Sequence, residues 1–299
     1  MSGRDSARVR ERAAGAFAGF FDGDPAALLV LTLVAMYALL VLAPLVPGID
    51  PTAGAVIVTV LFTLGALAAA MLTARMGLSP WVQAGGLLLG IINWFLYATA
   101  GMSGPLSRLT AVPAADIFLV FAMILGGLLL SRIVRERTMI VPVAIVLALA
   151  DVFTVYLGGP TGAALEKMPE LVEAVSVKLP AVGSAAGPEG LEGLAHIATL
   201  GPGDTFFAAL FFAAVIRFGL SVRRTFGWLF GVTGVALGLF VAVPAMPPVP
   251  VLPLMAAGFL IANWHDVKLS KREWAYMAVA FGFLIVLFAG LRYLVQAAL

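Results

Sequence analysis

Hydrophobic residues in this chain form long, unbroken runs, and short segments rich in Gly, Pro and charged residues separate the runs. About 20 consecutive apolar residues make a helix long enough to cross the hydrocarbon core of a bilayer. The pattern therefore predicts membrane-spanning helices. Nine are expected, over residues 26–46, 54–74, 81–100, 114–134, 139–157, 199–221, 226–243, 250–264 and 274–296.

The same runs argue against strands, because the strands of a membrane barrel alternate apolar and polar positions over about ten residues. We therefore expect an all-α, polytopic membrane protein with about nine transmembrane helices in one bundle. Composition agrees with this expectation: 62% of the 299 residues are hydrophobic and 11% are charged. Soluble domains are typically about 45–50% apolar and about 25% charged.

One connection, residues 158–198, is longer than the others and is rich in Gly, Pro and Ala. It lies within the second of two predicted regions: residues 1–138 hold a basic N-terminal tail and four helices, and residues 139–299 hold five. Residues 165–179 fit an amphipathic helix on the membrane surface, but a solvated linker is the preferred interpretation. The polar N-terminus and the uninterrupted run after it do not resemble a cleavable signal peptide.

The Lys and Arg residues indicate how the chain is oriented in the cell membrane. With nine spans, fourteen of these residues fall on one side and four on the other. Short cytoplasmic loops are enriched in Lys and Arg, so the N-terminus should be cytoplasmic, and the C-terminus and the 158–198 loop external. The net charge of +2 gives no reason to expect nucleic acid as a partner.

The inventory of reactive side chains is short. The chain has no cysteine and only two histidines, which argues against disulfides, thiol catalysis and a Cys or multi-His metal site. Three polar residues of the third span, Gln83, Asn93 and Tyr97, are expected to make hydrogen bonds between helices.

Two aspartates stand out because they lie inside predicted spans, where an ionised Asp costs at least about 2.5–3.5 kcal/mol. Asp151 is two-thirds of the way along the fifth span, and Asp204 is early in the sixth. These spans are consecutive and antiparallel, so the two carboxylates are expected to face each other at a similar depth. Each Asp alone could instead be a helix cap or an interhelical hydrogen-bond partner. Carboxylates that share a site hold one proton between them and can act as a general base and a general acid.

Two further segments favour a reaction at these carboxylates. Gly201-Pro202-Gly203 immediately precedes Asp204 and predicts an opening of the helix that admits water and lets backbone approach closely. Prolines crowd residues 244–253, which are expected to be extended at the head of the eighth span. The alternative for this segment is a simple loop that ends in a proline of the first helical turn.

Together these motifs resemble the presenilin and signal peptide peptidase family of intramembrane aspartyl proteases, including its archaeal members. That family has one Asp on a span, Gly-x-Gly-Asp on the next, and Pro-Ala-Leu after one further span. Here Asp151, Asp204 in its Gly-Pro-Gly-Asp motif, and Pro250-Val251-Leu252-Pro253 take these places. The resemblance covers roughly residues 139–264 and includes the stretch from Asp151 to Tyr156.

The chain also departs from the family. Ala150 precedes the first Asp where the family usually has Tyr, and Val251 replaces the Ala of the third motif. The N-terminal half is one span short, and an extra span follows the proline motif. Both carboxylates remain, so these departures affect the fine tuning of the site more than its chemistry.

The resemblance implies an aspartic endopeptidase that cleaves transmembrane helices or signal peptides within the bilayer, and it implies no metal or organic cofactor. Asp151 and Asp204 would be the catalytic pair. Gly201, Pro202, Gly203 and Tyr156 would shape the site, and Pro250, Val251, Leu252 and Pro253 would bind an extended substrate by strand addition. The predicted orientation matches signal peptide peptidases, and so suggests substrates whose N-termini are cytoplasmic.

Other functions remain open at this point. Prepilin peptidases also use Gly-x-Gly-Asp, but they carry a Lys soon after it, whereas Thr205-Phe206-Phe207 follows here. A proton- or cation-coupled transporter could use the same two aspartates and the same interrupted helix, although no inverted repeat is visible. A purely structural membrane protein would leave the paired aspartates unexplained.

Overall fold

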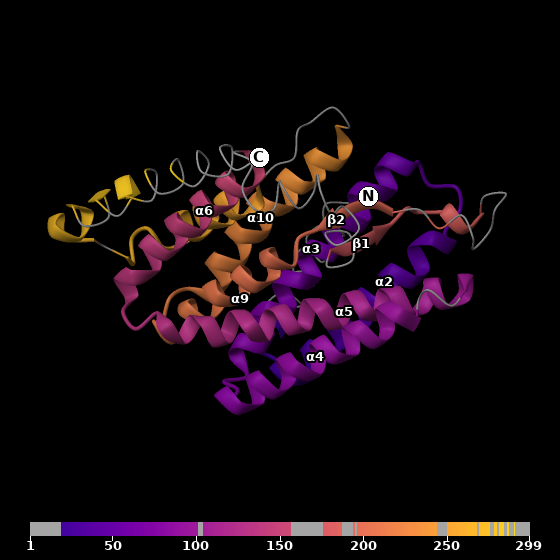
Figure 1. Ribbon diagram of the computed structural model, residues 1–299, viewed down its shortest axis with the longest axis horizontal. Helices are drawn as coiled ribbons and strands as arrows, with labels where there is room; N and C mark the ends of the chain where they lie inside the picture. The colour runs from indigo at the N-terminus through magenta and orange to yellow at the C-terminus, as the bar shows by residue number, and fades with distance from the viewer. Residues whose placement is uncertain are drawn as a thin grey trace, which may run out of the picture.

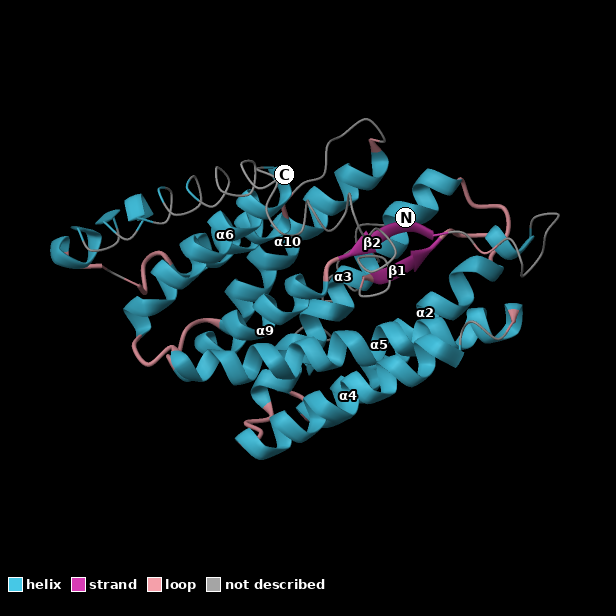
Figure 2. Ribbon diagram, viewed as in Figure 1, coloured by secondary structure: helices cyan, strands magenta, loops and turns pink. Residues whose placement is uncertain are grey.

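A computed structural model describes residues 19–100, 104–156, 176–186, 194, 196–243, 250–267, 269–275, 278–279, 281–283, 286 and 290. The described helices pack side by side in an elongated bundle (Figure 1), and nearly all of the described chain is helical (Figure 2). In chain order they are α2 (Pro25–Leu42), α3 (Pro51–Arg75), α4 (Pro80–Ala100), α5 (Pro105–Leu130), α6 (Ile140–Tyr156), α9 (Pro202–Arg217), α10 (Val222–Ala242) and α11 (Val251–Asn263). Four short 3-10 helices are η1 (Ala43–Leu45), η3 (Ser131–Ile133), η4 (Arg137–Met139) and η5 (Ser184–Ala186).

Five helices in the described part of the chain are long and apolar enough to cross a membrane. They are α2 continued by η1, α3, α4, α5 continued by η3, and α10. The all-α class is therefore confirmed, and the five apolar helices agree with a helical membrane protein. Helices α6, α9 and α11, with 17, 16 and 13 residues, are shorter than a typical span of about 20. The ninth predicted span lies mostly outside the described residues, so the count of nine stays a prediction.

Local signals in the sequence determine where the first helices begin. The Asp24 carboxylate accepts hydrogen bonds from the Ala26 and Ala27 amides at 3.2 and 3.3 Å, and Pro25 occupies the first turn of α2. Asp50 caps α3 in the same way through the Ala53 amide at 2.9 Å. A side-chain acceptor at the cap satisfies an amide that has no partner within the helix.

Helix α5 begins nine residues earlier than expected, at Pro105 instead of residue 114. It continues through Pro113, whose ring the helix accommodates within its first three turns. The earlier start makes Asp116 the twelfth residue of α5. The side chain of Asp116 is 4% exposed.

Helices α3 and α5 organise the bundle. Helix α5 packs against α4 on one side and α9 on the other, and α3 contacts α2, α9 and α10. Helix α11 packs on α10 and on α6. The stacked rings of Phe211 and Phe259, whose centroids are 4.7 Å apart, join α9 to α11 in the interior.

The long connection contains a β ribbon that the sequence analysis did not predict. Strand β1 (Val177–Pro180) pairs antiparallel with β2 (His196–Leu200), with Val177 opposite Leu200 and Lys178 opposite Thr199. Val177 and Leu179 are almost fully buried. The expected surface helix is therefore wrong over 177–179, and a solvated linker is wrong there too. Residues 158–175, 187–193 and 195 of the predicted loop lie outside the described residues.

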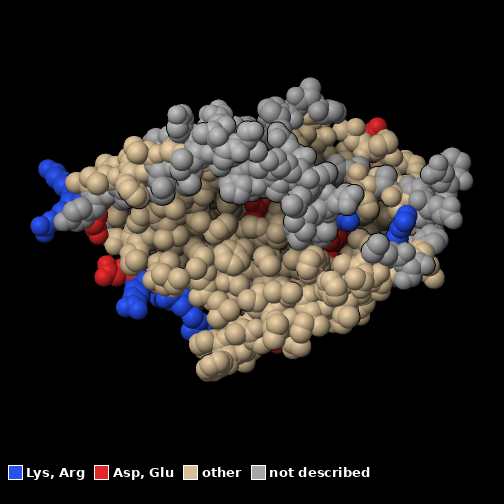
Figure 3. Space-filling model, viewed as in Figure 1, with Lys and Arg blue, Asp and Glu red and all other residues tan. Residues whose placement is uncertain are grey.

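Charge is distributed unevenly over the molecule. Lys and Arg gather at one end in the view of Figure 3, and a broad surface of uncharged residues separates them from the few at the other end. A one-sided distribution of this kind agrees with the asymmetry expected from the sequence. Which end faces the cytoplasm stays a prediction.

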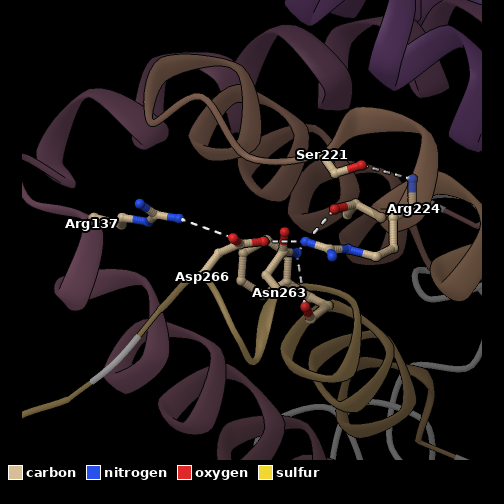
Figure 4. A network of polar contacts seen from close by, with 7 residues as sticks. Arg137, Ser221, Arg224, Asn263 and Asp266 are labelled. Atoms are coloured by element: carbon tan, nitrogen blue, oxygen red, sulfur yellow. Dashed lines mark hydrogen bonds and ion pairs between the residues drawn. The ribbon is translucent and has the colours of Figure 1, made fainter.

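An ionic network lies where α10 begins and α11 ends (Figure 4). Asp266, just beyond α11, contacts Arg137 of η4 at 3.9 Å and also pairs with Arg224 of α10. Nearby, the Asn263 amide donates to the Thr225 hydroxyl at 2.9 Å. The network joins α10, α11 and the connection that leads into α6.

The three polar residues of α4 have different outcomes. The Gln83 side-chain oxygen accepts a hydrogen bond from Arg132 Nε at 3.2 Å, which confirms an interhelical bond. Asn93 is half-buried and donates to the Leu89 carbonyl of its own helix at 2.8 Å, so the expectation is wrong there. The ring of Tyr97 stacks on Phe118 of α5, with centroids 5.4 Å apart.

Candidate active site

Asp204 lies in the first turn of α9, immediately after the β ribbon. Strand β2 ends at Leu200, Gly201 is extended (φ −65°, ψ 135°), and the helix begins at Pro202. The sixth helix therefore begins at 202 and not at 199, because residues 199 and 200 belong to β2. The helix opening expected before Asp204 is present, since Pro in the first turn needs no N–H partner.

The glycines beside Asp204 do not have the role expected of them. A Cβ on Gly201 would lie 3.9 Å from Asp204 Oδ2, and one on Gly203 would lie 4.0 Å from the Phe207 ring. Both are ordinary contact distances. Neither glycine has the positive φ found at Gly48, Gly77, Gly183 and Gly219. The extended backbone of Gly201 and the proline define this turn, and close backbone approach does not require the glycines.

Asp151 is the twelfth residue of α6 and is half-buried. Its Oδ2 accepts a hydrogen bond from the Leu252 backbone N–H at 3.0 Å. Leu252 is in the first turn of α11, where backbone N–H groups have no partner within the helix. Asp151 therefore caps α11 from a neighbouring helix, and the first and third sequence motifs are in direct contact.

The proline motif is only partly extended. Pro250 is extended (φ −65°, ψ 121°), but Val251, Leu252 and Pro253 form the first turn of α11. The extended conformation expected for 250–253 is therefore wrong beyond Pro250, because Pro is tolerated in the first turn of a helix. Residues 244–249 lie outside the described residues. The Leu252 N–H is engaged by Asp151, so strand addition would have to use other backbone groups.

The two aspartates approach one another, although their helices are not principal neighbours. The negative charge of Asp151 acts on the Asp204 carboxyl. Helix α6 packs mainly on α11, whereas α9 packs on α5 and α3 and also touches α11. Helix α11 thus connects the two acid-bearing helices, a relationship that their order along the chain does not indicate.

A small cavity adjoins Asp204. Its volume of about 30 Å³ is enough for at least one water molecule. Its polar lining comes from Thr63, Asp204, Thr205 and Thr233, and Val251 of the proline motif also borders it. The side chain of Tyr156, the remaining predicted site residue, lies outside the described residues.

Two supporting residues escaped the sequence analysis. A Cβ on Gly127 of α5 would lie 2.0 Å from the Phe206 carbonyl oxygen, so only glycine lets α5 approach α9 this closely. The buried Asp116 carboxylate accepts a hydrogen bond from the Lys178 amide of β1 at 3.1 Å. The adjacent pair Gly126-Gly127, and the helix start at Pro105, were the signals that could have indicated them.

No protein-family model, curated protein or solved structure matches this chain. The functional argument therefore uses the motifs of the chain and the geometry of its own residues.

Proposed function

We propose that this protein is an intramembrane aspartyl protease of the presenilin and signal peptide peptidase type, with nine spans and a cytoplasmic N-terminus. Asp151 and Asp204 would hydrolyse peptide bonds within transmembrane helices. The observation that carries the proposal is the Asp151–Leu252 hydrogen bond at 3.0 Å between residues 101 positions apart. It brings the first Asp to the proline motif, while the charge of that Asp acts on the second.

The chemistry requires one proton shared by two carboxylates. The ionised carboxylate takes a proton from water as the water oxygen attacks the scissile carbonyl carbon. The protonated carboxylate donates its proton to the carbonyl oxygen. Collapse of the tetrahedral intermediate breaks the C–N bond, and a proton returns to the leaving amine. The cavity beside Asp204 has room for the attacking water.

The substrate class follows from the predicted topology and from the resemblance. Transmembrane helices or signal peptides with cytoplasmic N-termini would enter from the bilayer and unwind locally before cleavage. An extended segment needs backbone partners. The β ribbon and the extended Pro250 lie directly before α9 and α11, two of the helices that border the cavity, and they could supply such partners.

The test is cleavage of a single-span substrate by the purified protein in liposomes, with products identified by mass spectrometry. Asp151→Asn and Asp204→Asn should each lower kcat by at least about 10²-fold. The matched control is Asp22→Asn, the same change at an exposed ion pair with Arg223, and it should cleave like wild type. Folded Asp151 and Asp204 variants that cleave normally would refute the proposal.

A proton- or cation-coupled transporter is the second candidate. The specific observation in its favour is the helix that begins only at Pro202, which places Asp204 beside a cavity inside an apolar bundle. Ion flux measured in the same liposomes distinguishes the two functions. Flux that depends on both aspartates, without cleavage of any substrate, would favour the transporter. The prepilin-peptidase type has less support, because Thr205-Phe206-Phe207 follows the motif.

A further inference from the structure

A third carboxylate is buried in the bundle and plays no part in the proposed reaction. Asp116 is the twelfth residue of α5, and its side chain is 4% exposed. A carboxylate at such a position is costly unless it has a specific partner. Asp116 should therefore have a hydrogen-bond donor in direct contact with its side chain.

The partner of Asp116 is a strand and not another helix. Its Oδ2 accepts the backbone N–H of Lys178 in β1 at 3.1 Å. A buried oxygen that loses its donor keeps the cost of its desolvation, so this contact attaches the ribbon to α5.

The attachment leaves the pairing of the ribbon intact. In an antiparallel pair, successive residues of a strand direct their backbone N–H groups alternately toward the partner strand and away from it. The Lys178 N–H reaches α5, so it belongs to the outer edge of β1, and its opposite residue in the register is Thr199. Asp116 therefore binds a group that β2 does not use.

The ribbon leads directly to the proposed active site. Strand β2 ends at Leu200, and after Gly201 the chain enters the first turn of α9, which carries Asp204. Helix α5 thus contacts this region twice: through Asp116 to β1, and through Gly127 to Phe206, two residues after Asp204. We propose that Asp116 is a positioning residue that holds the β1–β2 ribbon on α5 and thereby sets the position of Asp204. The catalytic part of this inference rests on the proposed function.

The experiment compares two ways of removing the bond with two matched controls. Asp116→Leu removes the acceptor and Lys178→Pro removes the donor, while the outward N–H is not needed by the ladder. Asp116→Asn keeps an acceptor oxygen, and Lys178→Ala keeps the N–H. Asp116→Leu and Lys178→Pro should each lower kcat about 10- to 100-fold, as expected for a misplaced catalytic group, with KM changed less than about twofold. Asp116→Asn and Lys178→Ala should keep a kcat near that of wild type.

A second readout separates displacement of the ribbon from its loss. The chain has no cysteine, so Lys178→Cys with Thr199→Cys introduces one defined pair at directly opposite positions. Opposite residues of this kind lie within disulfide distance. The disulfide should form equally in the wild-type and Asp116→Leu backgrounds, which would show that the ribbon persists when its attachment is lost. Its failure to form with Asp116→Leu would show loss of the ribbon and overturn the positioning role.

Hydrogen exchange at the Lys178 amide tests the attachment without any proteolysis. Exchange should be at least about tenfold faster in Asp116→Leu than in wild type or Asp116→Asn, since the amide loses its acceptor. Unchanged exchange, or an Asn variant as inactive as the Leu variant, would overturn the inference. If wild type cleaves no substrate, the proposed function fails, and exchange still decides whether Asp116 holds the ribbon.

Discussion

The closest approach between α5 and α9 offers the sharpest test of how the bundle positions Asp204. In Gly127→Ala the added Cβ would lie 2.0 Å from the Phe206 carbonyl oxygen, whereas real Cβ atoms essentially never come within 3.0 Å of another heavy atom. The obstacle is backbone, which cannot rotate away as a side chain can. The two helices must therefore separate by about 1 Å, the difference between these two distances.

The expected magnitude combines two opposing terms. Forcing extra volume into a packed interior typically costs about 1–3 kcal/mol, while replacing Gly by Ala inside a helix returns about 0.8–1 kcal/mol. The net effect of Gly127→Ala should be a loss of up to about 2 kcal/mol of stability. Phe206 is two residues from Asp204, so a shift of about 1 Å should also lower kcat by up to about 10²-fold.

The assay is thermal unfolding in detergent, combined with cleavage kinetics in liposomes. The control is Gly231→Ala on α10, where an added Cβ meets nothing within 4 Å. That variant should gain up to about 1 kcal/mol, because only the helix-propensity term applies. The reasoning would be refuted if Gly127→Ala were as stable as Gly231→Ala and retained wild-type kcat.

Three further outcomes are expected. Asp266→Ala removes the ion pairs with Arg137 and Arg224, whose side chains are about 40% exposed. It should cost only about 0.5–1 kcal/mol and less in high salt, and thermal unfolding at two salt concentrations measures this. The Ser270 amide donates to Glu273 and holds the pKa of that carboxyl below its usual value. The stabilising contact is therefore complete above the usual pKa and is lost as pH falls through the lowered pKa; carboxyl NMR would show this, and Glu273→Gln should abolish the dependence. A tag in the 158–198 loop should be accessible from outside intact cells; a tag reached only after permeabilisation would reverse the predicted topology.

Much of the helical framework can be predicted from the sequence because the bilayer imposes local rules. Backbone N–H and C=O groups in lipid must be satisfied within the segment, so a long apolar run becomes a helix whatever its neighbours are. Caps such as Asp24 and Asp50 are equally local, since each acts within three residues along the chain. Asp151 and Asp204 can be identified for the same reason, because an ionisable residue within a long apolar run is visible in the sequence without knowledge of its neighbours in space.

Only the tertiary structure decided which groups meet. Asp151 bonds Leu252 across 101 residues, and Asp116 bonds Lys178 across 62. Neither pairing leaves a periodic pattern along the chain. Strand β1, at 177–180, could not be predicted, because a short strand is stabilised by its partner strand and by the helices that bury it, and not by its own composition. Gly127 likewise resembles any other helical glycine until the Phe206 backbone is placed beside it. Helix formation in a membrane is a local requirement, whereas the contacts that build a site depend on how the helices pack.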